Sequence, residues 1–483
     1  MNHNIITKNY YFFIPVIIFL GIVLRIYNLN FEDFWSDEMV SYWLSDPKYS
    51  FFETLEIIFK SNLTISYELI LKYFHSLFGY NIKISRYLNA ILSIISIFYF
   101  YRLLIKNSDN EKNNKAVACL GLFLISLNIF HIRYAIEVRA YTLTFLLSLI
   151  YFDLIFYKKL IAKNLGFLKY LFIFIISIFL LFSHAFSIII LISTNFYILI
   201  NYLLKRNYSK ESIYIFFINI FSASLFLIIY LNGINHTPYW IGQVKNSFYT
   251  NFYFSNFFGS RLVGTIYLVT LIITLKVFFK DAVKKLDINF FFIILIFFTY
   301  FIPLVYGYLV NPILIPRYIF FVLIPILFLI TNFSLKIKNT ILKKTIILSL
   351  IVFTFFNHFT ENTFKQFYVK IYPSKPEIGK SLKYINNLKY HNFTFLMDQN
   401  NFLNINSIYS NYLKSYAELI NKNMKLIDYQ KDKVEYDQVW LMYITDVTNQ
   451  KKFKKPKFFD NYSIVSNKNF NHVQLYLLKK NGS

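Results

Sequence analysis

Four carboxylates lie close together in the segment FEDFWSDEM, directly after the first strongly apolar run of the chain: Glu32, Asp33, Asp37 and Glu38. An acid held at the edge of a bilayer is partly desolvated, and desolvation makes a carboxylate a better proton acceptor. The segment therefore suits general-base chemistry. The alternative is an interface loop in which Trp35 anchors at the lipid headgroups and the acids are merely solvated.

A second polar cluster stands in the segment YAIEVRAY, where Glu137 and Arg139 have Tyr134 and Tyr141 on either side. A guanidinium group binds phosphate through parallel hydrogen bonds, and a neighbouring acid can orient it. The functional interpretation is an arginine fork for a phosphate. The alternatives are an internal Glu–Arg pair, or charged side chains that simply reach out of the membrane.

Further candidates are His184, in the segment LFSHAFS, and Arg317, which follows a proline at the start of a late apolar run. A lone histidine at such a junction is more often a packed residue than a functional one. Helix N-termini favour anions, and Arg317 adds a fixed positive charge there. The topology predicted from the distribution of basic residues puts three more arginines near outer helix ends: Arg25, Arg86 and Arg261. Outer arginines oppose the usual inside bias of basic residues, and phosphate binding explains them.

Membrane helices have to position these residues, because the chain of 483 residues is 56% hydrophobic and its mean hydropathy is +0.45. A spanning helix needs about 20 apolar residues to cross roughly 30 Å of hydrocarbon. The single cysteine, Cys119, allows no internal disulfide and no cysteine-rich metal site. The sequence predicts about eleven spans, near residues 10–29, 84–105, 115–131, 140–157, 168–183, 185–204, 212–231, 261–279, 288–306, 316–334 and 342–358.

The formal net charge of +25 follows the predicted topology. With the N-terminus inside, alternate loops are rich in lysine and arginine, as cytoplasmic loops are. The intervening loops are poor in lysine and are expected outside. Because topology accounts for much of the basicity, nucleic acid is not expected as a partner.

The same topology places the polar clusters on one face of the membrane. The outer parts are expected to be loop 30–83, segment 131–141, His184, loop 232–260 and segment 311–318. Two short stretches within the first of these loops have helical apolar spacing and suit helices that lie on the membrane surface. We expect residues 1–358 to form a transmembrane domain that includes this loop.

The rest of the chain, residues 359–483, is expected outside because an odd number of spans precedes it. A helix-like stretch over 376–388 is followed by short apolar runs that are typical of β-strands. These runs lie at 392–399, 424–430, 438–445 and 472–480. The sequence therefore predicts a polytopic α-helical membrane protein with a small C-terminal extracytoplasmic α/β domain.

The order of the motifs resembles a known family. An arginine and W-x-DE follow the first span, SRYLNAIL opens the second, and E-x-R-x-Y opens the fourth. SH lies between the fifth and sixth spans, and PRY with a later proline opens a span near the tail. Over residues 10–330 this order is similar to that of the GT-C glycosyltransferases that use polyprenyl-phosphate sugars. The bacterial protein O-mannosyltransferase and aminoarabinose transferase-like branch, which is glycosyltransferase 39-like, is the closest match.

The resemblance implies roles for named residues. Asp37 matches the acid that deprotonates the acceptor hydroxyl, and Glu38 is its neighbour. The implied catalytic residues are Asp37, Glu38 and Glu137. The implied donor phosphate-binding residues are Arg139, Arg317, Tyr318 and Arg86, and the implied donor or acceptor contacts are His184, Tyr141 and Trp35. A Pro-rich HPP segment of many relatives is replaced here by NLTISYELILKYFHSLFG, which lacks those prolines.

The implied activity is inverting transfer of a sugar, hexosyl or pentosyl, from a polyprenyl phosphate to an acceptor hydroxyl on a glycolipid, polysaccharide or protein. Membrane lipids would be the other partners. The implied location is a bacterial inner membrane, with the active site and the C-terminal domain on the periplasmic or extracellular side. Clustered carboxylates also suit a divalent cation, but the resemblance implies that no metal and no cofactor are required.

Three other functions fit parts of the sequence. A transporter of polysaccharide or lipid-linked sugar would hold its substrate charges near the middle of the bilayer, whereas these clusters stand at one face. An O-antigen ligase-like enzyme would centre its chemistry on a large late external loop, whereas the acidic loop comes first here. A membrane-anchored binding protein would need none of the clusters in the membrane part.

Overall fold

The computed structural model describes residues 3–27, 29–61, 64–107, 111–157, 160–161, 166–205, 210–233, 241–360, 363–364, 368, 375–388, 392–396, 413, 415, 425–428, 437–444 and 460–482. The chain divides into two compact units. Unit 1 comprises Met1–Tyr27, Ile58–Leu69 and Leu88–Thr363. Unit 2 comprises Asn28–Ile57, Ile70–Tyr87 and Phe364–Ser483. The domain boundary near residue 359 stays a prediction.

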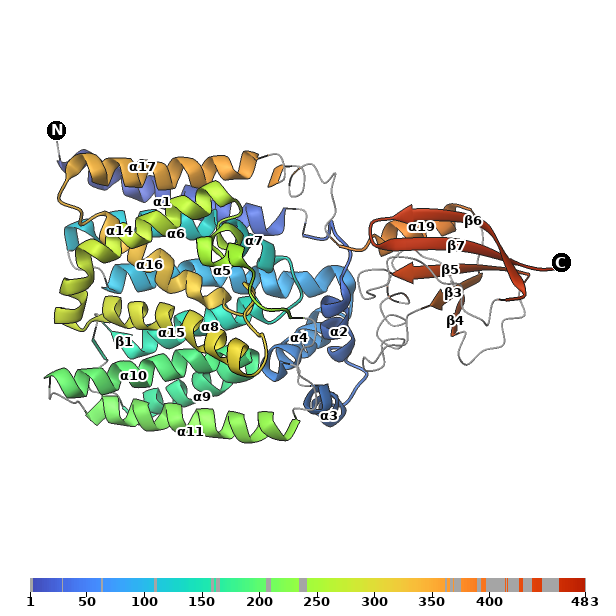
Figure 1. The fold of residues 1–483 in the computed structure, drawn as a ribbon, viewed down its shortest axis with the longest axis horizontal. Helices are drawn as coiled ribbons and strands as arrows, with labels where there is room; N and C mark the ends of the chain where they lie inside the picture. The colour runs from blue at the N-terminus through green and yellow to red at the C-terminus, as the bar shows by residue number, and fades with distance from the viewer. Residues whose placement is uncertain are drawn as a thin grey trace. The chain divides into compact units, whose positions relative to one another are not determined.

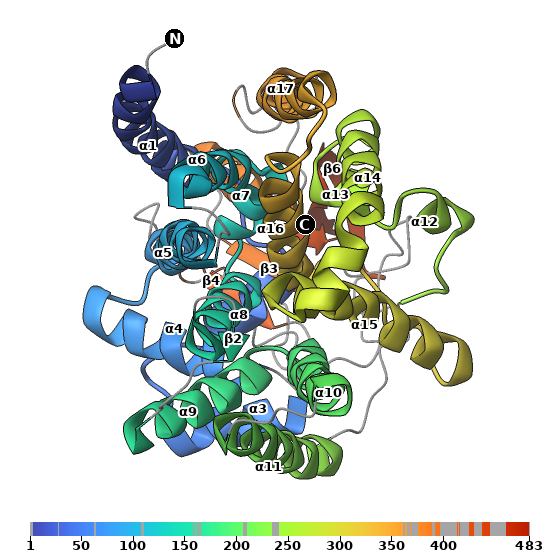
Figure 2. The same cartoon turned by 90° about the vertical axis from the view of Figure 1, so that its left-hand side faces the viewer.

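Unit 1 is a bundle of helices (Figures 1 and 2). Its long helices are α1 (His3–Ile26), α6 (Glu111–Ser126), α8 (Tyr141–Ile155), α9 (Phe167–Ser183), α10 (Ile188–Lys205), α11 (Lys210–Gly233), α14 (Arg261–Lys285), α15 (Ile288–Leu309), α16 (Leu323–Ser334) and α17 (Thr340–Phe356). Its short elements are α7 (Ile129–Ala135), α12 (Asn246–Asn251), α13 (Phe254–Phe257), η1 (Ala185–Ser187), η2 (Phe320–Val322), η3 (Asn357–Phe359), β1 (Phe156–Tyr157) and β2 (Leu160–Ile161). Three helices contribute residues to both units: α3 (Phe51–Ser61), α4 (Ile65–Phe78) and α5 (Ile82–Asn107).

The eleven apolar runs predicted as spans all coincide with helices. Among the described residues, six helices are long and apolar enough to cross a membrane, or seven if the bent pair Lys115–Ser126 and Ile129–Ala135 is one span. Shorter apolar helices occupy the other predicted positions, at Phe12–Ile26, Tyr141–Ile155, Phe167–Ser183 and Phe320–Ser334. A helix satisfies its own backbone hydrogen bonds, which is what an apolar environment demands. That all eleven cross a membrane stays a prediction.

Helix α16 forms the middle of unit 1. All twelve of its residues are buried, and Figure 2 shows it at the centre of the bundle. A helix that is apolar on every side is stable where other helices surround it. Its one amide side chain, Asn332, donates a hydrogen bond of 2.7 Å to Asn289 of α15, so its amide nitrogen has a partner inside the core, whereas its Oδ1 has none among the described residues.

The break between α6 and α7 is held by a buried arginine. The two helices meet at a bend of 57°, which leaves carbonyl groups at the end of α6 without helical partners. Arg25 of α1 is fully buried and donates to the carbonyl oxygens of Ser126 (2.9 Å) and Ile125 (3.2 Å). The same guanidinium lies 2.6 Å from Nδ1 of His131 in α7. Phosphate binding is expected for Arg25 from its position in the sequence, but these contacts give it a structural role.

An aromatic segment connects α12 to α14. Phe252 and Tyr253 both have positive φ, 48° and 63°, a conformation that costs non-glycine residues about 1–2 kcal/mol each. Tyr300 donates a hydrogen bond of 2.9 Å to the carbonyl of Phe252, and Tyr253 donates one of 3.0 Å to Leu314. Helices α13 and α14, which follow this segment, pack closely against each other: a Cβ atom at Gly264 of α14 would lie 2.6 Å from the backbone of Phe254 in α13.

Unit 2 contains α2 (Ser36–Leu44), α19 (Ile378–Asn387) and a five-stranded sheet of order β4-β3-β5-β7-β6. The strands are β3 (Asn392–Leu396), β4 (Lys425–Asp428), β5 (Gln438–Ile444), β6 (Tyr462–Phe470) and β7 (Val473–Lys480). β3 pairs in parallel with β4 and β5, whereas β7 pairs antiparallel with β5 and β6. The predicted helix and the four predicted strands are confirmed.

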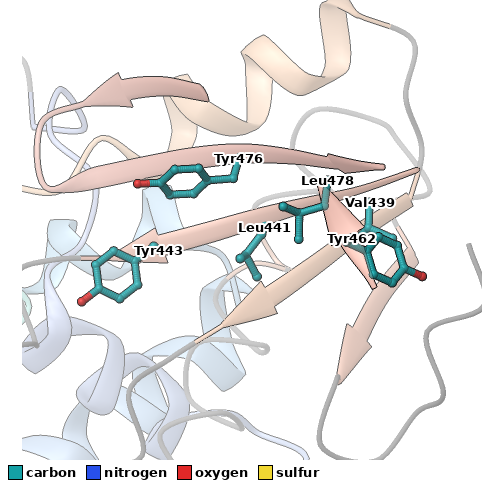
Figure 3. Close-up of a cluster of buried hydrophobic side chains, with 6 residues drawn as sticks. All are labelled: Val439, Leu441, Tyr443, Tyr462, Tyr476 and Leu478. Carbon is teal, nitrogen blue, oxygen red and sulfur yellow. The ribbon is translucent and has the colours of Figure 1, made fainter. Parts of the chain in front are cut away.

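The core of this sheet lies around β5. Val439, Leu441 and Tyr443 alternate along the strand and share one face, and Leu478 and Tyr476 stand opposite the first two in register. Figure 3 shows these side chains gathered with Tyr462. The intervening residues of β5 are buried on the other face, where Trp440 meets Tyr384 of α19 with ring centroids 6.1 Å apart.

Strand β6 is not predicted from the sequence. Its first residue is buried and most of the others are exposed. It has no alternation of apolar and polar residues, because it is an edge strand of the sheet and packs little surface. A bulge between Ile464 and Ser466 interrupts its pairing with β7, a common feature of sheet edges.

We expect Gly264→Ala to destabilise the protein by about 1–3 kcal/mol, because the added methyl group would overlap backbone atoms that cannot rotate away. The readout is the thermal unfolding midpoint of the purified protein in detergent. Gly242→Ala is the matched control, since a Cβ atom at Gly242 meets nothing within 4 Å. Equal midpoints for the two variants would contradict the close packing of α13 on α14.

Candidate functional site

The acidic loop of unit 2 leads into helix α2. Trp35 is the N-cap residue, and Asp37 and Glu38 lie in the first helical turn. The partial positive charge of a helix N-terminus stabilises carboxylates there. The two acids differ in exposure: the side chain of Asp37 is half-buried, whereas Glu38 has 0% of its surface exposed.

Glu38 is held between two cations. Its Oε1 lies 3.3 Å from a guanidinium nitrogen of Arg86 at the start of α5, and its Oε2 lies 2.6 Å from Nζ of Lys375 in the tail. The backbone N–H of Trp35 also donates to Oε2, at 3.4 Å. Because burying an unpaired carboxylate costs several kcal/mol, these partners explain how Glu38 remains inside unit 2.

Arg86 makes its hydrogen bonds to the same acidic loop. It is 1% exposed, and it donates to the carbonyls of Leu29 (3.1 Å) and Asp33 (3.2 Å). Its guanidinium also lies 4.9 Å from the centre of the Phe34 ring. The sequence predicts phosphate binding for Arg86 and catalysis for Glu38. Both roles stay predictions; the structure shows that each side chain is buried against protein groups.

Helix α4 supports this loop from the other side. His75 is buried, and its Nδ1 donates to the carbonyl of Ser45 (3.3 Å) while its Nε2 lies 2.9 Å from the hydroxyl of Ser85. Its ring packs edge-on against Tyr42 and Tyr80, which stack on each other with centroids 4.2 Å apart. Burial lowers the pKa of His75 to about 4, so the ring is neutral at pH 7.

In unit 1, residues Glu137 and Arg139 lie in the turn between α7 and α8. The N–H of Arg139 donates to the carbonyl of Glu137 at 2.8 Å, and Glu137 is largely buried. Asn89 of α5 holds this turn: its side-chain amide donates to the carbonyls of both residues and to Thr142. Tyr67 in turn donates to the amide oxygen of Asn89 at 2.6 Å.

Asn89 is not among the residues predicted from the sequence. It stands three positions after Arg86, in the segment SRYLN that opens α5. Residues three apart share a helix face, and a buried asparagine needs several partners. This spacing and residue type are the signal that could have identified it.

His184 gathers the other predicted residues of unit 1. Its ring centroid lies 5.8 Å from that of Tyr141 and 5.0 Å from that of Tyr318. Arg317 stands in the turn before η2, with its guanidinium carbon 5.7 Å from the centre of the Tyr318 ring. The charges of Arg139 and Arg317 both act on His184. The structure therefore brings together residues from three segments that the sequence predicts separately.

The protonation of His184 follows from its contacts. It lies between α9 and η1, and its Nδ1 accepts a hydrogen bond from the backbone N–H of Phe186 at 3.3 Å. The ring proton is therefore on Nε2. Burial lowers the pKa of His184 to about 3, and the two nearby guanidinium charges lower it further than burial alone. A neutral imidazole that offers an N–H donor and is influenced by two arginine charges is suited to bind an anion.

Each unit holds a cluster with its own chemistry. Unit 1 offers the positive charges of Arg139 and Arg317 with the N–H of His184, which suit a phosphate. Unit 2 offers the carboxylate of Asp37 at a helix N-terminus, which suits a general base. Among the described residues, no group of three or more His, Cys, Asp or Glu side chains could hold a metal ion.

Comparisons with known proteins give fold similarity only. No protein-family model matches the chain, and neither does any curated protein. Solved structures that are similar to this chain include the archaeal oligosaccharyltransferase AglB from Archaeoglobus fulgidus in complex with an inhibitory peptide and a dolichol-phosphate. That match has a TM-score of 0.49 and 8% identity, and covers 89% of this chain and 69% of that chain.

Two more structures of the Archaeoglobus fulgidus oligosaccharyltransferase are similar. One, tethered to an acceptor peptide containing the NVT sequon, has a TM-score of 0.46 and 9% identity, over 86% of this chain and 63% of that chain. The apo form has a TM-score of 0.49 and 9% identity, over 91% of this chain and 70% of that chain. Similarities of this size assign no role to any residue.

We expect the stability of the protein to fall as the pH drops from about 6.5 to about 4, in part through His75. Its folded pKa lies below the unfolded value, so the unfolded chain takes up the proton first in this window. The contribution present above pH 6.5 and lost by pH 4 is at most about 3 kcal/mol. The measurement is the unfolding midpoint against pH for wild type and for His75→Gln.

The variant should be less stable than wild type at pH 7.5 but should lose less stability on acidification. Exposed His472 provides the control His472→Gln, because its side chain lies at the β6–β7 turn. If His75→Gln and wild type show parallel pH profiles, His75 is not the group that titrates.

Proposed function

We propose that this chain is a membrane glycosyltransferase that moves a sugar from a polyprenyl phosphate to an acceptor hydroxyl, with inversion at the anomeric carbon. The apolar helices of unit 1 would hold the lipid chain of the donor. The reaction would take place at the periplasmic or extracellular face of a bacterial inner membrane. The acceptor would be a glycolipid, a polysaccharide or a protein.

The observation that carries the proposal is the environment of His184. Two arginines act on a neutral histidine that is flanked by the rings of Tyr141 and Tyr318. Guanidinium groups bind phosphate through parallel hydrogen bonds, and the phosphate of a lipid-linked sugar is a ligand of this kind.

In the proposed reaction, each of the two clusters has a separate task. The acceptor oxygen attacks the anomeric carbon while its proton passes to the carboxylate of Asp37. The bond between the anomeric carbon and the phosphate oxygen breaks, and its electron pair stays on the phosphate. Arg139 and Arg317 stabilise the charge that develops there, and the Nε2–H of His184 donates to the same group. The attack from the face opposite the leaving group inverts the anomeric carbon.

Exposure distinguishes the two neighbouring acids. A general base has to come within hydrogen-bond reach of the proton it removes. Asp37 is half-buried, whereas Glu38 is fully buried between Arg86 and Lys375. We therefore assign the base to Asp37 and a positioning role to Glu38. Glu137 is assigned to the turn that presents Arg139.

We expect Asp37→Asn to lower the rate of sugar transfer by about 10²–10⁴-fold, because the amide cannot accept the hydroxyl proton. The assay is transfer in membranes or detergent from a panel of polyprenyl-phosphate sugars, with the product measured by mass spectrometry. Glu53→Gln is the matched control, since Glu53 is an exposed acid in the first turn of α3 and accepts a hydrogen bond from the backbone N–H of Ser50. Full turnover by Asp37→Asn would refute the assignment of the base.

We expect Arg139→Gln and Arg317→Gln each to lower kcat/KM for the donor by about 10²–10³-fold, because each removes a charge that stabilises the leaving phosphate. Lys245→Gln provides the comparison, because Lys245 is an exposed lysine that precedes α12. The phosphate site would be wrong if all three variants used the donor equally well.

A further inference from the structure

The tail of the chain reaches the acidic loop through a short set of polar contacts within unit 2. We propose that the tail is part of the catalytic apparatus, with Lys375 and the N-terminus of α19 as positioning elements that fix the first turn of α2 and so orient Asp37. This inference rests on the proposed function of Asp37. It gives a function to the tail, in which the sequence contains no recognisable motif.

The first contact is the ion pair between Lys375 and Glu38. The ammonium group lies 2.6 Å from Oε2 of Glu38, and the two residues are 337 positions apart in the chain. The Lys375 side chain is 9% exposed and that of Glu38 is 0% exposed. A pair this buried is shielded from salt and water, so it holds its geometry better than a surface pair does.

The second contact joins Asp33 to helix α19. Its Oδ2 accepts a hydrogen bond of 2.6 Å from the backbone N–H of Gly379, in the first turn of that helix. First-turn N–H groups have no helical partner, and the helix dipole is positive at this end. Asp33 therefore satisfies α19 in the way that a capping residue does, although it comes from the other end of the sequence.

The tail segment that carries Lys375 is itself held by the turn between β6 and β7. The side-chain amide of Asn471, in the turn between β6 and β7, donates to the carbonyl of Lys375 at 2.9 Å. Glu377 and Asn471 exchange two more hydrogen bonds: the N–H of Asn471 donates to the Glu377 carboxylate, and the N–H of Glu377 donates to the Asn471 carbonyl, both at 3.0 Å. The β6–β7 turn thus anchors the backbone at Lys375 and again at Glu377, two residues later.

These contacts bear on Asp37 because of its place in the helix. Glu38 follows it directly, and both residues belong to the first turn of α2. Arg86 and Lys375 form ion pairs with Oε1 and Oε2 of the Glu38 carboxylate, respectively. Releasing one of them lets the carboxylate turn toward the other cation, and the helical turn that carries Asp37 turns with it. Small displacements of a catalytic group can lower a rate about 10²-fold.

The test is Lys375→Met in the full chain, which keeps the length of the side chain and removes its charge. We expect kcat for sugar transfer to fall about 10- to 100-fold with the KM for the donor unchanged. Lys375→Arg should recover most of the loss, because it restores the positive charge. Asp33→Ala should lower kcat in the same direction. Lys383→Met is the matched control, since Lys383 is an exposed lysine of α19.

Hydrogen exchange supplies a readout that does not depend on activity. In Lys375→Met, amide exchange should rise in peptides that cover residues 29–44, whereas Lys383→Met should leave it unchanged. In a double-variant cycle, Glu38→Gln with Lys375→Met should lose less rate than the two single losses combined, because both act on one pair.

The outcomes separate this inference from the proposed function. If Asp37→Asn is inactive while Lys375→Met keeps wild-type kcat and exchange, the tail does not position the base and the inference fails alone. If wild type transfers no sugar or Asp37→Asn is fully active, the proposed function fails, whatever the exchange data show. A fall in kcat for Lys383→Met equal to that for Lys375→Met would also overturn the inference.

Discussion

A buried carboxylate is the constraint on which unit 2 depends. Glu38 is fully enclosed, and the cost of removing its charge from water is offset by Arg86 on one side and Lys375 on the other. Loss of one partner from such a site costs about 3–5 kcal/mol, because the remaining charge stays buried. This dependence ties together three segments that are remote in sequence: the acidic loop, the start of α5 and the tail.

Unit 1 is organised by a different constraint, the satisfaction of backbone groups inside an apolar bundle. The apolar runs become helices because no other local structure satisfies its own hydrogen bonds in such surroundings. Where a helix breaks, as between α6 and α7, a polar side chain has to replace the missing partners. Arg25 does so for the end of α6, and Asn89 does so for the turn between α7 and α8.

These constraints explain what the sequence could predict. The eleven apolar runs and four of the five strands were found because their patterns are local. Strand β6 was missed because an exposed edge strand needs no apolar alternation. The roles of Glu38 and Arg86 depend on Lys375, which lies in a segment without a motif, so local sequence could not reveal that both are buried. Tyr141, His184 and Tyr318 are predicted as site residues because each stands beside a charged or aromatic motif at a helix end; their rings lie close together, and their roles stay predictions.

The division of labour between Asp37 and Glu38 follows from packing. Two adjacent acids in one helical turn point in different directions, because successive residues are about 100° apart around a helix. One direction leads into unit 2, where Arg86 and Lys375 hold Glu38, and the other leaves Asp37 half-exposed. A carboxylate enclosed by cations is not open to a substrate, whereas the proposed base, Asp37, is half-exposed. The two acids are thus not equivalent: Glu38 anchors the first turn of α2 inside unit 2, and Asp37 is the acid that this packing leaves at the surface.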